Sequence, residues 1–136
     1  MLPIYQDKFG TTIENPGNCL SACIASIFER NLNEVPNFAA ARDRWMDSYH
    51  AYMDRLGYRI LILQIPHDQS RNMPMTHYVV TGQSPRADCL HACVGYGGRI
   101  IHDPHPDGHG LIYPKDGMYS VDLFLPIGYT PKGEIQ

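Results

Sequence analysis

Residues 90–104 read LHACVGYGGRIIHDP, and this stretch predicts the hairpin on which the fold depends. Two apolar runs, 90–96 and 99–102, stand on either side of Gly97-Gly98. A glycine pair between two such runs is a strong signal for a tight turn that joins antiparallel strands. We therefore expect two adjacent strands here, the second of which closes with Asp103.

The length of the hairpin loop decides whether His91 and Asp103 face each other. A loop of three residues, 96–98, places the two directly opposite, on one face of the sheet and within hydrogen-bonding reach. A loop of two residues, 97–98, shifts the register by one and places them on opposite faces. We expect the three-residue loop, with Gly98 in the left-handed conformation, and hence a His91–Asp103 pair.

Two helices are expected upstream of the hairpin. Apolar residues repeat at helical spacing from Leu20 to Phe28 and predict a first helix over 19–29, with Asn18 as its N-cap. A second apolar stripe predicts a helix over 39–56, and Gly57 is a natural stop for it.

Three further strands are expected, at 58–65, 77–81 and 121–125, with polar or glycine- and proline-rich loops at 66–74, 82–88 and 104–110. Helices followed by antiparallel strands are typical of an α+β domain. We expect N-terminal helices packed on an antiparallel sheet, in one domain that spans 1–136.

The composition excludes several classes of protein. Hydrophobic residues make up 43% of the 136 residues, which is typical of a globular and not a disordered chain. The net charge is −3 and no lysine- or arginine-rich run occurs, which argues against nucleic acid as a partner. No apolar stretch is long enough to span a membrane, and residues 1–6 do not resemble a signal peptide. We therefore expect a cytoplasmic protein.

The four cysteines form two pairs with the same spacing, Cys19/Cys23 and Cys89/Cys93. A structural zinc site is one interpretation, but neither pair lies in the turn that a zinc knuckle needs. Disulfides are a second, and they are not expected without a secretion signal. We favour a third, in which one thiol is reactive and three are small buried residues, and we expect no metal or cofactor.

Cys19 is the strongest candidate for a reactive thiol because it stands at the start of the first helix. Helix N-termini carry a partial positive charge and unpaired N–H groups, which lower the pKa of a thiol and favour the thiolate. Cys23 lies one turn later, on the face of Ile27, and is expected in the core. A histidine could accept the thiol proton, and an aspartate could orient that histidine.

His91 and His77 compete for the role of the base, because each begins an expected strand. We favour His91, since the hairpin offers it Asp103, whereas His77 has no comparable partner because Asp88 lies in a loop. A third group of histidines lies with aspartates in the segment 102–109. A zinc or nickel site there is an open alternative.

Three motifs resemble the papain-like cysteine peptidase superfamily, in particular compact forms related to bacteriocin-leader peptidases. They are a cysteine at the head of the first long helix (17–22), a histidine that begins a strand (91–94) and an Asp-Pro that closes the next strand (100–104). The chain is also similar to small uncharacterised bacterial and phage proteins with a Glu-Val-Pro-Asn-Phe connector (34–38) and a His-Asp-Pro-His-Pro ending. The cysteine, the histidine and the aspartate occur in this order along the chain, and the resemblance covers about residues 6–104.

The resemblance implies a papain-like fold and a thiol hydrolase with the catalytic residues Cys19, His91 and Asp103. The scissile bond would be a peptide, isopeptide or side-chain amide bond, and the partner a protein or peptide substrate. An acyl transferase or deamidase with the same triad, and a binding module that keeps the fold without activity, stay open as alternatives.

An oxyanion intermediate needs hydrogen-bond donors, and the backbone N–H of Cys19 is one because helix-start N–H groups are free. The resemblance implies a glutamine upstream of the cysteine as the second donor. Gln6 is the nearest candidate, with Asn15 and Asn18 as alternatives.

Overall fold

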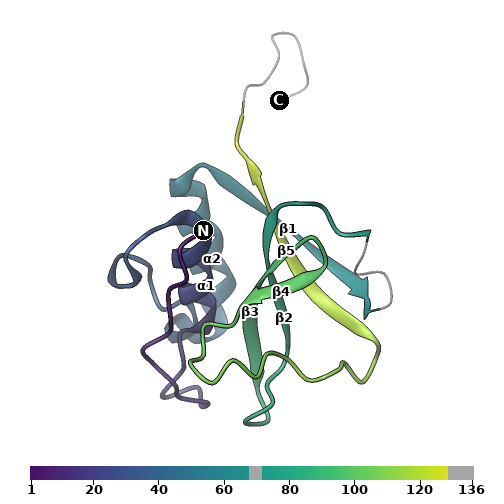
Figure 1. The fold of residues 1–136 in the computed structure, drawn as a ribbon. Helices are drawn as coiled ribbons and strands as arrows, with labels where there is room; N and C mark the ends of the chain where they lie inside the picture. The colour runs from purple at the N-terminus through teal and green to yellow at the C-terminus, as the bar shows by residue number, and fades with distance from the viewer. Residues whose placement is uncertain (68–71, 129–136) are drawn as a thin grey trace.

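The computed structural model describes residues 1–67 and 72–128. The helices and strands are α1 (Cys19–Phe28), the 3₁₀ helices η1 (Leu32–Glu34) and η2 (Phe38–Arg44), α2 (Trp45–Leu56), β1 (Tyr58–Pro66), β2 (His77–Gln83), β3 (Leu90–Tyr96), β4 (Arg99–His102) and β5 (Met118–Pro126). Helices α1 and α2 lie together on one side of the sheet (Figure 1). The expected α+β arrangement, two N-terminal helices on an antiparallel sheet, is confirmed.

The sheet has the strand order β1-β5-β2-β3-β4, and every pairing is antiparallel. The last strand, β5, therefore enters between β1 and β2 and joins the two parts of the sheet. At the other edge, β4 pairs only with residues 94–96 of β3. Among residues 1–67 and 72–128, no strand pairs with the first half of β3 on that side, and α1 packs against β3.

Two clusters of buried side chains lie on the two faces of the sheet. The larger cluster packs α1 and α2 on the sheet, with Ile24, Phe38, Tyr49 and Met53 as its largest members. The smaller one is on the other face; its buried residues are Tyr78, Val80, Cys93 and Val121. Leu111 and Tyr119 pack against this smaller cluster. Both faces of β2 and β3 are thus covered, which explains why nearly all of β3 is buried although it lies near the edge of the sheet.

The expected second helix is divided in the structure. Residues 38–44 form the 3₁₀ helix η2, and α2 begins only at Trp45. Arg42 has φ 55° and ψ −119°, a combination that no α-helix contains, so the helix cannot run through it. Apolar periodicity continues across such a break, which is why the pattern alone predicts one helix.

Other boundaries differ by a few residues. The helix α1 ends at Phe28 because Glu29 adopts a left-handed conformation. Strand β2 extends to Gln83 and β5 begins at Met118, where the sequence predicts 77–81 and 121–125. Four residues of the expected loop at 66–74, residues 68–71, lie outside the described part of the chain.

Asn18 precedes α1 but does not cap it through its side chain. Its Oδ1 accepts hydrogen bonds from the backbone N–H groups of Asp7 and Lys8, at 3.2 and 3.0 Å, and its Nδ2 donates to Asp7 Oδ1 at 2.8 Å. The side chain thus ties the N-terminal segment to the start of the helix and holds Cys19 in place.

Among the described helices, none has the length and apolar character needed to cross a membrane.

Candidate active site

The hairpin between β3 and β4 has a two-residue loop, so the expected three-residue loop is wrong. Tyr96 pairs with Arg99, and Gly97 and Gly98 have φ values of 58° and 91°. Positive φ at both central residues is the hallmark of the turn that best fits the twist of two antiparallel strands, and glycine adopts it without strain. That turn by itself would place His91 and Asp103 on opposite faces.

A bulge in β4 restores the shared face. Gly95 pairs with Ile100, but Val94 pairs with His102, so Ile101 has no partner. Continuing this register by one residue places Asp103 across from Cys93, two residues along β3 from His91. Because alternate residues of a strand face the same side, Asp103 and His91 share a face in spite of the short loop.

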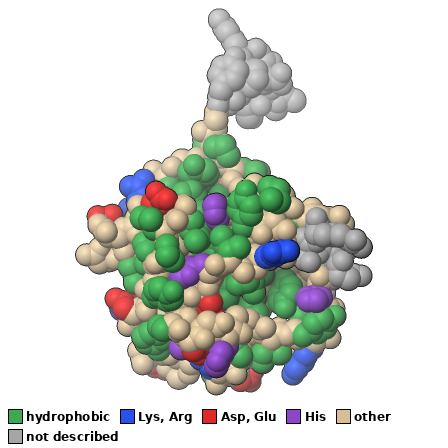
Figure 2. Space-filling view, viewed as in Figure 1, with side chains coloured by type: hydrophobic (Ala, Val, Ile, Leu, Met, Phe, Trp, Pro, Cys, Tyr) green, Lys and Arg blue, Asp and Glu red, His purple; other side chains and the backbone are tan. Residues whose placement is uncertain are grey.

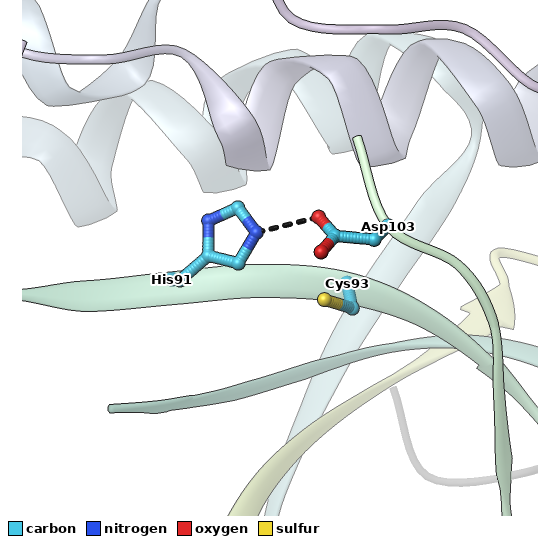
Figure 3. A group of neighbouring side chains, drawn as sticks. All are labelled: His91, Cys93 and Asp103. Atoms are coloured by element: carbon cyan, nitrogen blue, oxygen red, sulfur yellow. Dashed lines mark hydrogen bonds and ion pairs between the residues drawn. The ribbon is translucent and has the colours of Figure 1, made fainter. Parts of the chain in front are cut away.

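The expected His91–Asp103 pair is confirmed. His91 Nε2 lies 2.7 Å from Asp103 Oδ1, and each side chain is only 5% exposed (Figure 3). Asp103 also accepts hydrogen bonds from two backbone N–H groups, that of His105 at Oδ1 (2.9 Å) and that of Gly110 at Oδ2 (2.7 Å). The carboxylate is therefore held from three directions and has little freedom to turn away from the imidazole.

These contacts set the protonation of the pair. Burial alone would raise the pKa of Asp103, but the hydrogen bonds from His91, His105 and Gly110 outweigh it, and the pKa is lowered. Burial lowers the pKa of His91, and Asp103 opposes this shift only in part. At neutral pH the carboxylate is ionised and can only accept, so His91 Nε2 carries the proton that it donates. His91 Nδ1 is left with a lone pair that can accept a proton.

The loop after β4 closes over this pair. Arg86 Nη1 donates to both carboxylate oxygens of Asp107, at 2.9 and 3.1 Å. Asp107 also interacts with the Nδ1 atoms of His105 and His109, at 3.2 and 3.5 Å. His105 and His109 thus both pair with Asp107. They hold the backbone whose N–H groups bind Asp103.

Cys19 is the first residue of α1, and its side chain is half-buried. Burial raises the pKa of the Cys19 thiol, although the backbone N–H groups of Ala92 and Leu20 donate toward the sulfur and lower it. The expected lowering of this pKa is therefore wrong, because desolvation outweighs the helix-start N–H groups. Cys19 rests as a neutral thiol next to β3, beside the residue that follows His91.

A cavity of about 1070 Å³ contains both Cys19 and His91 in its lining. Its walls include exposed apolar side chains, among them Ile13, Trp45, Ile62 and Leu90. Figure 2 shows that hydrophobic side chains cover much of one face of the molecule, with histidines among them. Among the described residues, the side-chain hydrogen bond of His91 goes to Asp103, and none is recorded to Cys19. Proton transfer between them requires that Cys19 Sγ and His91 Nδ1 come within hydrogen-bonding distance inside this cavity.

The other three cysteines have different surroundings. Cys23 and Cys93 are fully buried, and Cys89 is half-buried. Burial and the neighbouring Asp103 carboxylate raise the pKa of Cys93 far above its usual range. Cys93 thus lies beside the His91–Asp103 pair as a neutral thiol, a neighbour that the sequence argument did not identify. The sequence could have indicated this neighbour, because side chains alternate between the two faces of a strand and residues 91 and 93 therefore share one face.

His91, Cys93 and Asp103 are the group of described residues that could hold a metal ion. Their ligand atoms all lie within 4.8 Å of one another, and all three residues are buried. Imidazole, thiolate and carboxylate together suit zinc. This group takes one cysteine from the Cys89/Cys93 pair and none from the Cys19/Cys23 pair, so it is not the four-cysteine site considered above.

His77 lies at the far end of the sheet from the pair. It stands opposite Tyr96, whereas His91 stands opposite Gly82, five residues further along β2. Five residues of a strand span about 16 Å. The ring of His77 packs against that of Tyr96 in a tilted arrangement, with 4.9 Å between ring centroids, and His77 is not part of the candidate site.

Gln6 is buried next to the site. Its backbone N–H donates to the carbonyl oxygen of Pro104, which follows Asp103, at 3.0 Å. Its Nε2 donates to the carbonyl oxygen of Lys8 at 2.9 Å, and its buried Oε1 has no hydrogen-bond partner. Asn15 is exposed, and the side chain of Asn18 is occupied by Asp7 and Lys8.

A second polar residue that the sequence argument missed is Asp122, which is 7% exposed and lines the same cavity as Cys19. A carboxylate inside the apolar run 121–125 was the signal that could have identified it.

Comparison of the chain with protein-family models, with curated proteins and with solved structures finds no significant match. Function therefore has to be argued from the site itself.

Proposed function

We propose that the protein is a thiol hydrolase of the papain-like type that cleaves a peptide, isopeptide or side-chain amide bond. Cys19 is the nucleophile, His91 the general base and acid, and Asp103 the group that orients His91. The observation that carries the proposal is the buried His91–Asp103 pair. His91 has a free Nδ1 atom, and it lines the same cavity as the half-buried Cys19. This combination supplies a base and an accessible nucleophile in one cleft.

The choice of Cys19 over Cys93 rests on access. Cys93 is nearer to Asp103, but it is fully buried and the carboxylate beside it opposes formation of a thiolate. A substrate carbonyl cannot reach it without opening the core. Cys19 lines the cavity, and the backbone N–H groups of Ala92 and Leu20 favour negative charge on its sulfur.

The reaction begins from a neutral thiol and a neutral imidazole. As the Cys19 sulfur attacks the carbonyl carbon, its proton passes to His91 Nδ1, and the carbonyl electrons move to the oxygen. His91 then protonates the leaving nitrogen as the C–N bond breaks, which leaves a thioester. Water attacks the thioester and gives its proton to His91, which returns it to the departing thiol.

The negative oxygen that forms in each half of the reaction needs donors. The backbone N–H of Cys19 is one, because it lies at the start of α1. Gln6 would be the second after its Nε2 leaves the carbonyl oxygen of Lys8, a bond that the structure holds at 2.9 Å. A catalytic thiol also has to stay reduced, and we place the activity in the cytoplasm for that reason.

An acyl transferase or a deamidase uses the same steps with a different acceptor or amide, and both remain within the proposal. A binding module without activity is the alternative of a different class. It requires that Cys19 never reaches His91 Nδ1.

The test is labelling with a peptidyl ketone that alkylates activated cysteines, read by mass spectrometry after proteolysis. We expect modification of Cys19 well before Cys23, Cys89 or Cys93 at pH 7, and loss of that rate in His91→Ala. Cys89 is the internal control, since it is half-buried like Cys19. Equal labelling of Cys19 and Cys89, unaffected by His91→Ala, would remove the nucleophile assignment and favour the binding module.

A further inference from the structure

Asp122 occupies an unusual place for a carboxylate, in the middle of the sheet and on the face that the helices cover. It stands between Ile62 of β1 and Val79 of β2. Its Oδ2 accepts a hydrogen bond from the hydroxyl group of Tyr49, on α2, at 2.9 Å. Burial raises the pKa of Asp122, and the Tyr49 hydroxyl opposes that shift.

The second oxygen of Asp122 is free toward the cavity. Among the described residues, no hydrogen bond to Asp122 Oδ1 is recorded. In the described part of the chain, the enclosed side-chain atoms without a partner are Gln6 Oε1 and Asn37 Oδ1, and Asp122 Oδ1 is not one of them. Because Asp122 lines the cavity, Oδ1 keeps its access to solvent through it. A buried carboxylate with one open acceptor is a strong site for a cation or an N–H donor.

The floor around Asp122 is polar. Gln64, Ser120 and Thr81 lie directly across from one another on β1, β5 and β2, and all three line the cavity. They share the face of Asp122, two residues away along β5. Because all three line the cavity, the row is accessible from it.

The walls above this floor are apolar, with Leu20, Trp45 and Met46 contributed by the two helices. A lysine or arginine side chain matches such a site, because its methylene stem packs on apolar walls while its charged end reaches a polar floor. The other ionisable residues in the lining, apart from Cys19, are His91, which is neutral at pH 7, and Arg42 and Asp43, which are exposed and of opposite sign. Among the lining residues, Asp122 is therefore the buried charge that makes the cavity prefer a positively charged side chain.

We propose that Asp122 lies at the bottom of a specificity subsite and there binds a lysine or arginine side chain of the substrate. This inference rests on the proposed hydrolase function, because it concerns the cavity that contains Cys19. The bound ammonium or guanidinium group would donate to Asp122 Oδ1, while Tyr49 keeps Oδ2 in place. The substrate class that follows is a peptide with a basic residue close to the bond that is cleaved.

The test uses peptidyl acyloxymethyl ketones that differ at a single residue, which is lysine, norleucine or glutamate. Norleucine has nearly the shape of lysine without its charge. Each of the three positions before the reactive ketone is varied in turn, and the rate of Cys19 modification is followed by mass spectrometry. At one of these positions we expect the lysine probe to react at least about tenfold faster than the norleucine probe, and the glutamate probe to react slowest.

Two variants separate charge from structure. In Asp122→Asn the amide oxygen can still accept from Tyr49, so the fold is kept, and the rates for lysine and norleucine should become equal. In Tyr49→Phe the charge is kept and the hydrogen bond is lost, so the preference for lysine should persist.

The outcomes distinguish the two proposals. Cys19 modified at equal rates by lysine and norleucine probes at all three positions overturns the subsite alone, as does a lysine preference that survives Asp122→Asn. If no probe modifies Cys19, the hydrolase function is overturned, and the subsite with it.

Discussion

His91 Nε2 lies 2.7 Å from Asp103 Oδ1 because a bulge at Ile101 compensates for a two-residue hairpin loop. The short loop shifts the pairing register of β4 by one residue, which turns its side chains to the other face. The bulge shifts the register by one residue more and returns Asp103 to the face of His91. The pairing in the candidate site thus depends on an irregularity of the strand, which is a common role for bulges near functional sites.

The first prediction concerns the two members of this pair. Asp103→Asn should lower the rate of Cys19 modification by a peptidyl ketone about a hundredfold or more, since an asparagine side chain no longer fixes the proton on Nε2. His91→Ala should nearly abolish that rate at pH 7. The matched controls are Asp88→Asn and His77→Ala, which lie outside the site. If the control variants lose as much, the assignment of the base is wrong.

The second prediction concerns the bulge. Deletion of Ile101 removes the unpaired residue, so the strands pair without interruption and His102 still stands opposite Val94. Asp103 stays on the face of His91, and the labelling rate of Cys19 should stay within about tenfold of the parent. Ile101 is 44% exposed, so the core loses little.

Deletion of both Ile100 and Ile101 is the contrasting variant. It shifts the register by one more residue and turns Asp103 to the other face, so labelling should fall as far as in Asp103→Asn. Circular dichroism checks that both variants fold. Equal labelling in the two deletion variants contradicts the parity argument.

The third prediction concerns stability against pH. The folded pKa of His91 is lowered, so the unfolded chain binds more protons once the pH falls below about 6.5, and stability decreases with it. The folded pKa of Asp103 is also lowered, so its contribution is present above about pH 3.9 and is lost as the pH falls through the folded pKa.

Urea unfolding at pH 7.5 and pH 5.0 measures the histidine part. We expect the free energy of unfolding to decrease on acidification, and His91→Asn to show a smaller decrease. His67→Asn is the control, because this exposed histidine packs against Tyr113 and not against His91 or Asp103. A decrease that is unchanged in His91→Asn speaks against a neutral, buried His91.

The fourth prediction concerns the metal alternative. If His91, Cys93 and Asp103 act through hydrogen bonds, a chelator should leave the melting temperature unchanged. Cys93→Ala should cost about 1 kcal/mol of stability for the small cavity it creates, and leave Cys19 labelling intact. Metal analysis of the purified protein completes the test. One zinc ion per chain that disappears in Cys93→Ala would assign the group to a metal.

Much of the local structure was determined by the sequence alone. The apolar repeat from Leu20 to Phe28 predicted α1, and Gly57 predicted the end of α2. The apolar runs around Gly97-Gly98 predicted β3 and β4 with their observed bounds. These features are local, since a helix period or a tight turn depends on residues that are near each other in the chain.

The tertiary structure decided what depends on distant partners. It inserted β5 between β1 and β2, which no local pattern indicates, and so brought Asp122 beneath the cavity of Cys19. It placed the extra residue at Ile101, within β4 and not in the loop, and from there the bulge returns Asp103 to the face of His91. It raised the pKa of Cys19 where the helix start alone predicts a lowered one. Desolvation is set by everything that packs around a group, and that is known only once the chain has folded.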